Sequence, residues 1–61
     1  MNNKEKEVII ELIIKAYCEI ENFNYDNLSS DGYDKMYYMC YKLDDLMLIS
    51  RLYELYEILY K

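Results

Sequence analysis

The chain has 61 residues, a formal net charge of −5, no histidine and two cysteines, and 54% of its residues are hydrophobic. This length fits one domain, and this hydrophobic content excludes a disordered chain. Without histidine or a CxxC spacing, we predict no metal site and no cofactor, and we expect Cys18 and Cys40 to be free buried thiols rather than a disulfide. The negative charge repels phosphate backbones, so we predict no direct nucleic-acid binding.

Charged residues interrupt the apolar runs of the chain, and no segment reaches the roughly 20 apolar residues of a membrane span. The first seven residues lack the small-residue cleavage site of a signal peptide. We therefore predict a cytoplasmic protein with no membrane partner. The acidic charge suits a partner with a basic surface, although it could also serve solubility alone.

The first helix is predicted over residues 3–22. Asn2 is its expected N-cap, with Glu5 as the capping-box partner, and Glu11 and Lys15 have the favourable i,i+4 spacing. The β-branched run at residues 8–10 would also suit a strand, but the 3.6-residue period favours the helix. Its apolar arc is about 200° wide, well beyond that of a surface helix. Such a helix needs more than one neighbour, which predicts self-association; a three-helix monomer is the alternative.

A loop is predicted over residues 23–31, where Asn, Asp, Ser and the single Gly collect. Asn22 or Asn24 is expected to end the first helix in the left-handed region, and Asp31 or Ser30 to cap the next. The run from Asn27 to Gly32 matches the first half of a calcium-binding EF-hand loop. The bidentate Glu at position 12 of that loop is absent, because Tyr38 stands there. A capped turn explains the same residues, so we predict no calcium site.

The second helix is predicted over residues 32–60, and its apolar face changes side at Asp44-Asp45. Met36, Met39, Cys40 and Leu43 share a face before the change, and the opposite face is apolar after it. Either Asp could cap a third helix here, but the absence of Gly, Pro and Asn favours one continuous helix. A helix of that length would extend past the first, which predicts an all-α hairpin that dimerises as a four-helix arrangement. The candidate dimer-interface residues are Ile10, Ile14, Leu48, Leu52, Leu55 and Leu59.

Nine tyrosines are the remaining unusual feature, seven of them within residues 33–60. Tyrosine and methionine are enriched at protein interfaces, because tyrosine gives large contact area at little entropic cost and methionine adapts its shape. The alternative is that they half-fill the core of a small bundle. The candidate partner-binding residues combine these tyrosines with nearby acidic side chains: Tyr37, Tyr41, Asp44, Asp45, Tyr53, Glu54, Tyr56, Glu57 and Tyr60.

Two resemblances bear on function. The run from Cys40 to Asp44 is similar to the Ser-Gln-Glu-Leu-Asp signature of small sporulation-regulating aspartyl-phosphate phosphatases, with Leu43, Asp44 and Leu46 matching and Cys40 replacing the serine. That likeness implies a helical hairpin in which Asp44 acts on a response regulator. By size, charge and composition alone, the chain also resembles small acidic inhibitors made by phages and mobile elements, the anti-CRISPR class among them.

The sequence contains no other arrangement of residues that supports catalysis, because paired carboxylates without histidine or a Gly-rich loop are typical of a solvated helix face. We therefore predict a protein without catalytic, cofactor-binding or metal-binding residues, acting as a stoichiometric inhibitor or adaptor. Its expected partner is a host protein of a bacterial defence or nucleic-acid-handling complex, in a bacterial or phage-infected cell. The alternatives are the phosphatase and a purely structural oligomerisation module.

Overall fold

The computed structural model describes residues 1–61 and shows an all-α protein with three α-helices and one short 3-10 helix. These are α1 (Asn3–Ile20), η1 (Tyr25–Asn27), α2 (Ser30–Tyr41) and α3 (Asp45–Tyr60). The predicted all-α class is confirmed. No helix has the length and apolarity needed to cross a membrane.

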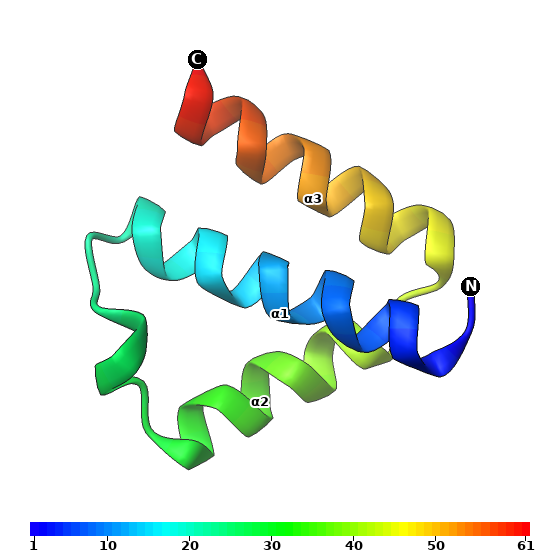
Figure 1. Ribbon diagram of the computed structural model, residues 1–61, viewed down its shortest axis with the longest axis horizontal. Coiled ribbons are helices and arrows are strands. Elements are labelled where there is room, and N and C mark those ends of the chain that lie inside the picture. The colour runs from blue at the N-terminus through cyan, green and yellow to red at the C-terminus, as the bar shows by residue number, and fades with distance from the viewer.

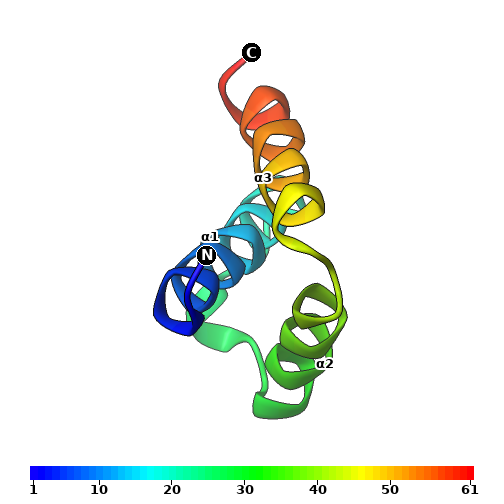
Figure 2. The ribbon, with the colours of Figure 1, turned by 90° about the vertical axis from the view of Figure 1, so that its right-hand side faces the viewer.

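Helix α1 lies between the other two helices (Figure 1) and contacts both of them. Helices α2 and α3 diverge from their short connection and scarcely contact each other (Figures 1 and 2). The Cα atoms occupy 30 × 29 × 15 Å, so the molecule is flat. A flat arrangement of three helices leaves much of each helix without a neighbour.

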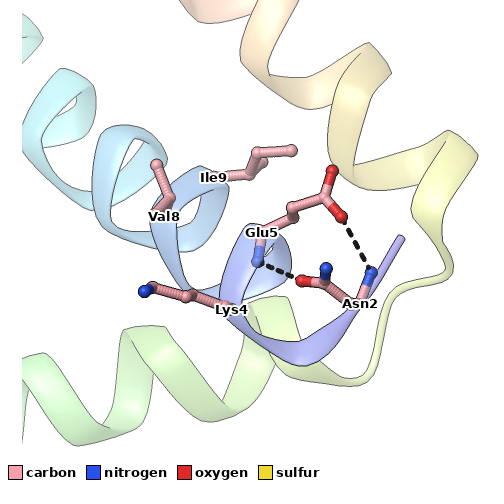
Figure 3. Close-up of a pocket in the computed structure, with 5 residues that line it drawn as sticks. All are labelled: Asn2, Lys4, Glu5, Val8 and Ile9. Atoms are coloured by element: carbon pink, nitrogen blue, oxygen red, sulfur yellow. Dashed lines mark hydrogen bonds between the residues drawn. The ribbon is translucent and has the colours of Figure 1, made fainter.

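Both ends of α1 are fixed by local hydrogen bonds. At its N-terminus the Glu5 N–H donates to Oδ1 of Asn2 at 2.8 Å and the Asn2 N–H donates to Oε1 of Glu5 at 3.3 Å (Figure 3), which confirms the predicted capping box. At its C-terminus Asn22 adopts a left-handed conformation, with φ 57°, as predicted. The Phe23 N–H donates to the carbonyl of Cys18 at 2.8 Å, which completes a Schellman motif. The helix therefore ends at Ile20, two residues earlier than expected.

The start of α2 differs from the prediction. Ser29, rather than Ser30 or Asp31, is the N-cap, and its Oγ accepts a hydrogen bond from the Gly32 N–H at 3.0 Å. Asp31 instead lies in the first turn, where the helix dipole favours its charge. The segment before α2 is partly ordered as η1, because the Asn24 side chain accepts a hydrogen bond from the Asp26 N–H at 3.0 Å.

The prediction of one continuous helix over residues 32–60 is wrong, and the broken alternative is correct. Asp44 has an extended backbone, with φ −75° and ψ 171°, and its Oδ1 accepts a hydrogen bond from the Met47 N–H at 2.8 Å. This cap compensates for the interruption of the helix, and the break lets α3 return along α1. The two apolar faces of residues 32–60 therefore belong to two helices, each packed against α1.

The core consists of seven residues from all three α-helices: Ile10, Ile13, Ile14, Ala16, Cys40, Leu48 and Leu55. Both cysteines are free and buried, as predicted. The predicted pair of Glu11 and Lys15 forms on the surface, with Lys15 Nζ 3.6 Å from Glu11 Oε1.

The residues proposed for a dimer interface pack inside one chain. Ile10, Ile14, Leu48 and Leu55 are buried, and Leu52 and Leu59 are partly buried against the same core. The wide apolar arc of α1 is covered by two helices of its own chain, which is the arrangement of the three-helix alternative. A dimer of this fold must therefore use other side chains.

Candidate protein-binding surfaces

An open apolar groove lies where α2 and α3 diverge over α1. Its main hollow has a volume of about 420 Å³ and is lined by Tyr17, Glu21, Met36, Met39, Cys40, Leu43 and Arg51. A second hollow of about 410 Å³ continues toward the loop and shares Tyr17, Glu21 and Met36 with the first. We call the main hollow and its continuation the methionine groove.

The walls of the methionine groove are apolar and adaptable. Met39 is 70% exposed at its edge, whereas Met36 and Leu43 are partly buried along its side. Methionine has three rotatable bonds and a polarisable sulfur, which suit it to irregular partner surfaces. The sequence placed these residues on one helix face but assigned that face to the core of a hairpin. The break at Asp44 leaves it partly open instead.

Two of the polar side chains that line the groove, Arg51 and Tyr17, are partners of each other. Arg51 Nη1 donates a hydrogen bond to the Tyr17 hydroxyl at 3.2 Å, which connects α3 to α1. Burial raises the pKa of the Cys40 thiol, and the positive charge of Arg51 only partly opposes that rise. Because the thiol is protonated at neutral pH and the chain has no histidine to act as its base, Cys40 fits an apolar wall better than a nucleophile.

Three of the four tyrosines of α2 form a stack along the seam between α1 and α2. The ring centroids of Tyr33 and Tyr37 are 6.1 Å apart, and those of Tyr37 and Tyr41 are 6.0 Å apart. Lys6 Nζ lies 4.4 Å from the centroid of the Tyr41 ring. Burial raises the pKa of Tyr37, and the carboxylate of Glu7 on α1 raises it further. Tyr37 and Tyr41 therefore help to attach α2 to α1, although Tyr41 keeps an exposed edge.

A second apolar surface runs along α3. Its residues are exposed and are spaced by three, four, three and four positions: Leu46, Ile49, Tyr53, Tyr56 and Tyr60. The rings of Tyr56 and Tyr60 meet edge to face, with centroids 5.6 Å apart. We call these five residues the tyrosine flank. Its three tyrosines were among the predicted partner-binding residues, whereas Leu46 and Ile49 were not, although their alternating spacing with the tyrosines is visible in the sequence.

Of the four acidic residues predicted to bind a partner, two have structural contacts and two are exposed without one. Asp44 caps α3, and Oδ2 of Asp45 lies 3.0 Å from the N-terminal amino group of Met1. Glu54 and Glu57 are exposed on α3 without an ion pair. Tyr53, Tyr56, Glu57 and Tyr60 surround one shallow hollow with Lys61, so the structure brings these candidates together. It separates them from Tyr37 and Tyr41, because α2 and α3 diverge from each other over α1 and scarcely make contact (Figure 1).

Two further hollows have structural explanations. The hollow at the N-terminus of α1 is lined by Asn2, Lys4, Glu5, Val8 and Ile9, and its amide and carboxylate oxygens form the capping box (Figure 3). The hollow beside η1 includes Ser29, whose hydroxyl oxygen caps α2. No group of three or more histidine, cysteine or acidic side chains is placed to hold a metal ion.

Comparisons with known proteins give no relative from which a function could be transferred: no protein-family model, curated protein or solved structure matches the chain.

Proposed function

We propose that this protein acts without catalysis, as an inhibitor or adaptor that binds another protein through the methionine groove. The observation that carries the proposal is an open groove of about 420 Å³ with apolar walls from α1 and α2, in a chain where only 8 of 61 residues are buried. Concave hollows with mostly apolar walls and a volume of this order are typical binding sites in proteins. The groove suits an amphipathic helix whose apolar side chains enter between α2 and α3.

Charge defines the partner further. The chain carries a net charge of −5, and Glu21 is exposed where the two hollows of the groove join. A partner segment with lysine or arginine beside its apolar side chains would be attracted to this surface and oriented on it. Together with the likeness to small acidic inhibitors, this charge extends the proposal to a host protein with a basic surface in a bacterial defence or nucleic-acid-handling complex.

The experiment is affinity capture with three immobilised proteins: wild type, Met39→Glu and Tyr38→Glu. Met39 borders the groove, whereas its neighbour Tyr38 is exposed outside it, so the two variants add the same charge at adjacent positions. We expect a partner that wild type and Tyr38→Glu retain from a bacterial lysate and that Met39→Glu retains at least tenfold less. Circular dichroism should show unchanged helix content in both variants. Equal retention by Met39→Glu and wild type would reject the groove as the binding site.

The phosphatase alternative gains no support from the position of Asp44. One oxygen of its carboxylate accepts the capping hydrogen bond from Met47, which explains an aspartate here without catalysis. The third alternative concerns self-association, and we retain self-association as part of the proposal because the chain leaves the tyrosine flank exposed.

A further inference from the structure

We propose that two copies of the chain pair through the tyrosine flank as an antiparallel pair of α3 helices. This inference rests on the self-association proposed above and assigns it to a surface other than the buried leucines. The occupant of the flank is thus a second copy of the same chain, and the methionine groove stays open in the dimer.

The spacing of the flank is the first support. Leu46, Ile49, Tyr53, Tyr56 and Tyr60 follow the alternating steps of three and four that define the a and d positions of a coiled-coil seam. The core-facing residues Leu48, Leu52, Leu55 and Leu59 have the same alternation on a neighbouring face, and α1 covers that face. α3 therefore has two seams, of which only one has a partner within the chain.

Exposed area is the second support. The exposed fractions are 76% for Leu46, 39% for Ile49, 71% for Tyr53, 37% for Tyr56 and 76% for Tyr60. With about 200 Å² for a fully exposed large side chain, these fractions give about 600 Å² of side-chain surface per copy. A standard interface buries about 800 Å² per partner. Polar residues beside the flank, such as Ser50 and Glu57, would supply the remaining area.

The total surface of the chain agrees with this estimate. The chain exposes 4801 Å². A compact monomer of its mass would expose about 4,250 Å² by the scaling of folded proteins. The excess, about 550 Å², is close to the area of the flank derived from its exposed fractions. If a partner covered this one helix face, the exposed area of the chain would therefore fall to that of a compact folded protein of its mass.

The sizes of the side chains favour the antiparallel direction. The smaller Leu46 and Ile49 lie in the first half of the flank, and the three tyrosines follow them. In an antiparallel pair, small residues of one helix meet tyrosines of the other, so the separation of the helices stays even. A parallel pair would place tyrosine against tyrosine at one end and force the helices to diverge. The opposed helix dipoles also favour the antiparallel direction.

The flank and the methionine groove lie on different sides of α3. Tyr53 follows Arg51, which lines the groove, by two residues and hence by about 160° around the helix. A second copy on the flank would therefore not fill the groove. This separation makes self-association and partner binding independently testable.

The first experiment measures the mass in solution by light scattering and sedimentation over micromolar concentrations. We expect wild type to reach twice the 7.5 kDa of one chain, Tyr53→Glu to remain at the single-chain mass, and Tyr38→Glu to behave as wild type. A wild-type mass of one chain at every concentration would reject self-association itself. A dimer that Tyr53→Glu leaves intact would reject only the flank, and neither result depends on partner capture through Met39.

The second experiment tests direction. Spin labels on Lys61→Cys, in a background with Cys18 and Cys40 replaced by alanine, should lie more than about 20 Å apart in an antiparallel pair, because 16 helical residues span about 24 Å. Circular dichroism and the solution mass must first show that this background folds and dimerises. Labels about 10 Å apart, the spacing of adjacent helices, would overturn the antiparallel arrangement.

Discussion

Asp44 stands where α2 gives way to α3, and its carboxylate satisfies the Met47 N–H at 2.8 Å. We expect Asp44→Ala to lower the free energy of unfolding by about 1 kcal/mol, the usual cost of losing an N-cap. Urea denaturation followed by circular dichroism measures this loss. Asp44→Asn should be nearly neutral, because asparagine caps a helix as well as aspartate does.

The same pair of variants separates two roles of Asp44. A capping role predicts that Asp44→Asn keeps both stability and partner capture. A phosphatase that used the Asp44 carboxylate would lose its activity in this variant while keeping its fold. An Asp44→Ala variant as stable as wild type would contradict the capping role.

Caps show how far residue-level prediction from sequence extends. The Asn2 and Glu5 capping box was predictable, because one suitable pair precedes a long apolar period, and the left-handed end of the helix was limited to Asn22 or Asn24, of which the structure shows Asn22. The cap of α2 was not predictable, since Ser29, Ser30 and Asp31 are adjacent and all suit the position. Leu28 and Tyr33, on either side of these three residues, are partly buried against the core.

At the scale of elements, the break between α2 and α3 could be recognised from sequence but not decided by it. The change of apolar face at Asp44 indicated either a break or two different neighbours. Local propensity favoured continuity, because no Gly, Pro or Asn lies there. The burial of Leu48 and Leu55 against α1 outweighs that preference, and this burial depends on contacts between residues distant in sequence. The methionine groove exists only because of the break, so the groove could not be predicted from the sequence either.

The seam between α1 and the loop-α2 segment should be sensitive to alkali. Burial raises the pKa of Tyr25 and of Tyr33 above the ordinary value near 10, and the carboxylate of Glu11 on α1 raises both further. The folded state therefore holds these protons more tightly than the unfolded state. Their stabilising contribution is complete below about pH 10 and is lost as the pH rises through the folded pKa values.

Thermal unfolding between pH 8 and pH 11.5 tests this expectation. The midpoint should fall above about pH 10. It should fall less in Tyr33→Phe, which keeps the ring beside Tyr37 but has no proton to lose. Tyr38→Phe, at an exposed position of α2 outside both the methionine groove and the tyrosine flank, is the matched control and should follow wild type. If the midpoint of Tyr33→Phe falls with pH as much as those of wild type and the control, the seam is not the cause of the loss of stability in alkali.

For the whole molecule, the sequence predicted the helical class and most of the first helix. It assigned the second apolar half of residues 32–60 to the interface with another chain, whereas Leu48 and Leu55 of that half are buried in the core of the same chain. The wide arc of α1 indicated two neighbours, and periodicity cannot say whether these come from one chain or two. The chain still leaves apolar side chains without a neighbour, but these belong to the tyrosine flank rather than to the leucine face of α3.

Because α2 and α3 scarcely contact each other, the stability of the entire chain depends on α1. Ile13 is fully buried in the core that unites all three helices. We expect Ile13→Ala to cost about 2–5 kcal/mol, as truncation of a buried isoleucine does. The free energy of unfolding of a chain this short is only about 3–9 kcal/mol, so the variant should lie near its unfolding threshold. Ile13→Val should cost about 0.5–1.5 kcal/mol.

Hydrogen exchange shows whether the stability lost in Ile13→Ala is lost equally by α2 and α3. If α1 unites the molecule, Ile13→Ala should reduce the protection of amides in α2 and α3 by the same factor, since neither helix has another apolar neighbour in its chain. Val8→Ala, an exposed change on the same helix, should leave both protected. Self-association through α3 would keep the amides of α3 more protected than those of α2 at high protein concentration. Tyr53→Glu should remove this difference between the two helices. Loss confined to α2 in the monomeric Tyr53→Glu background would contradict the central role of α1.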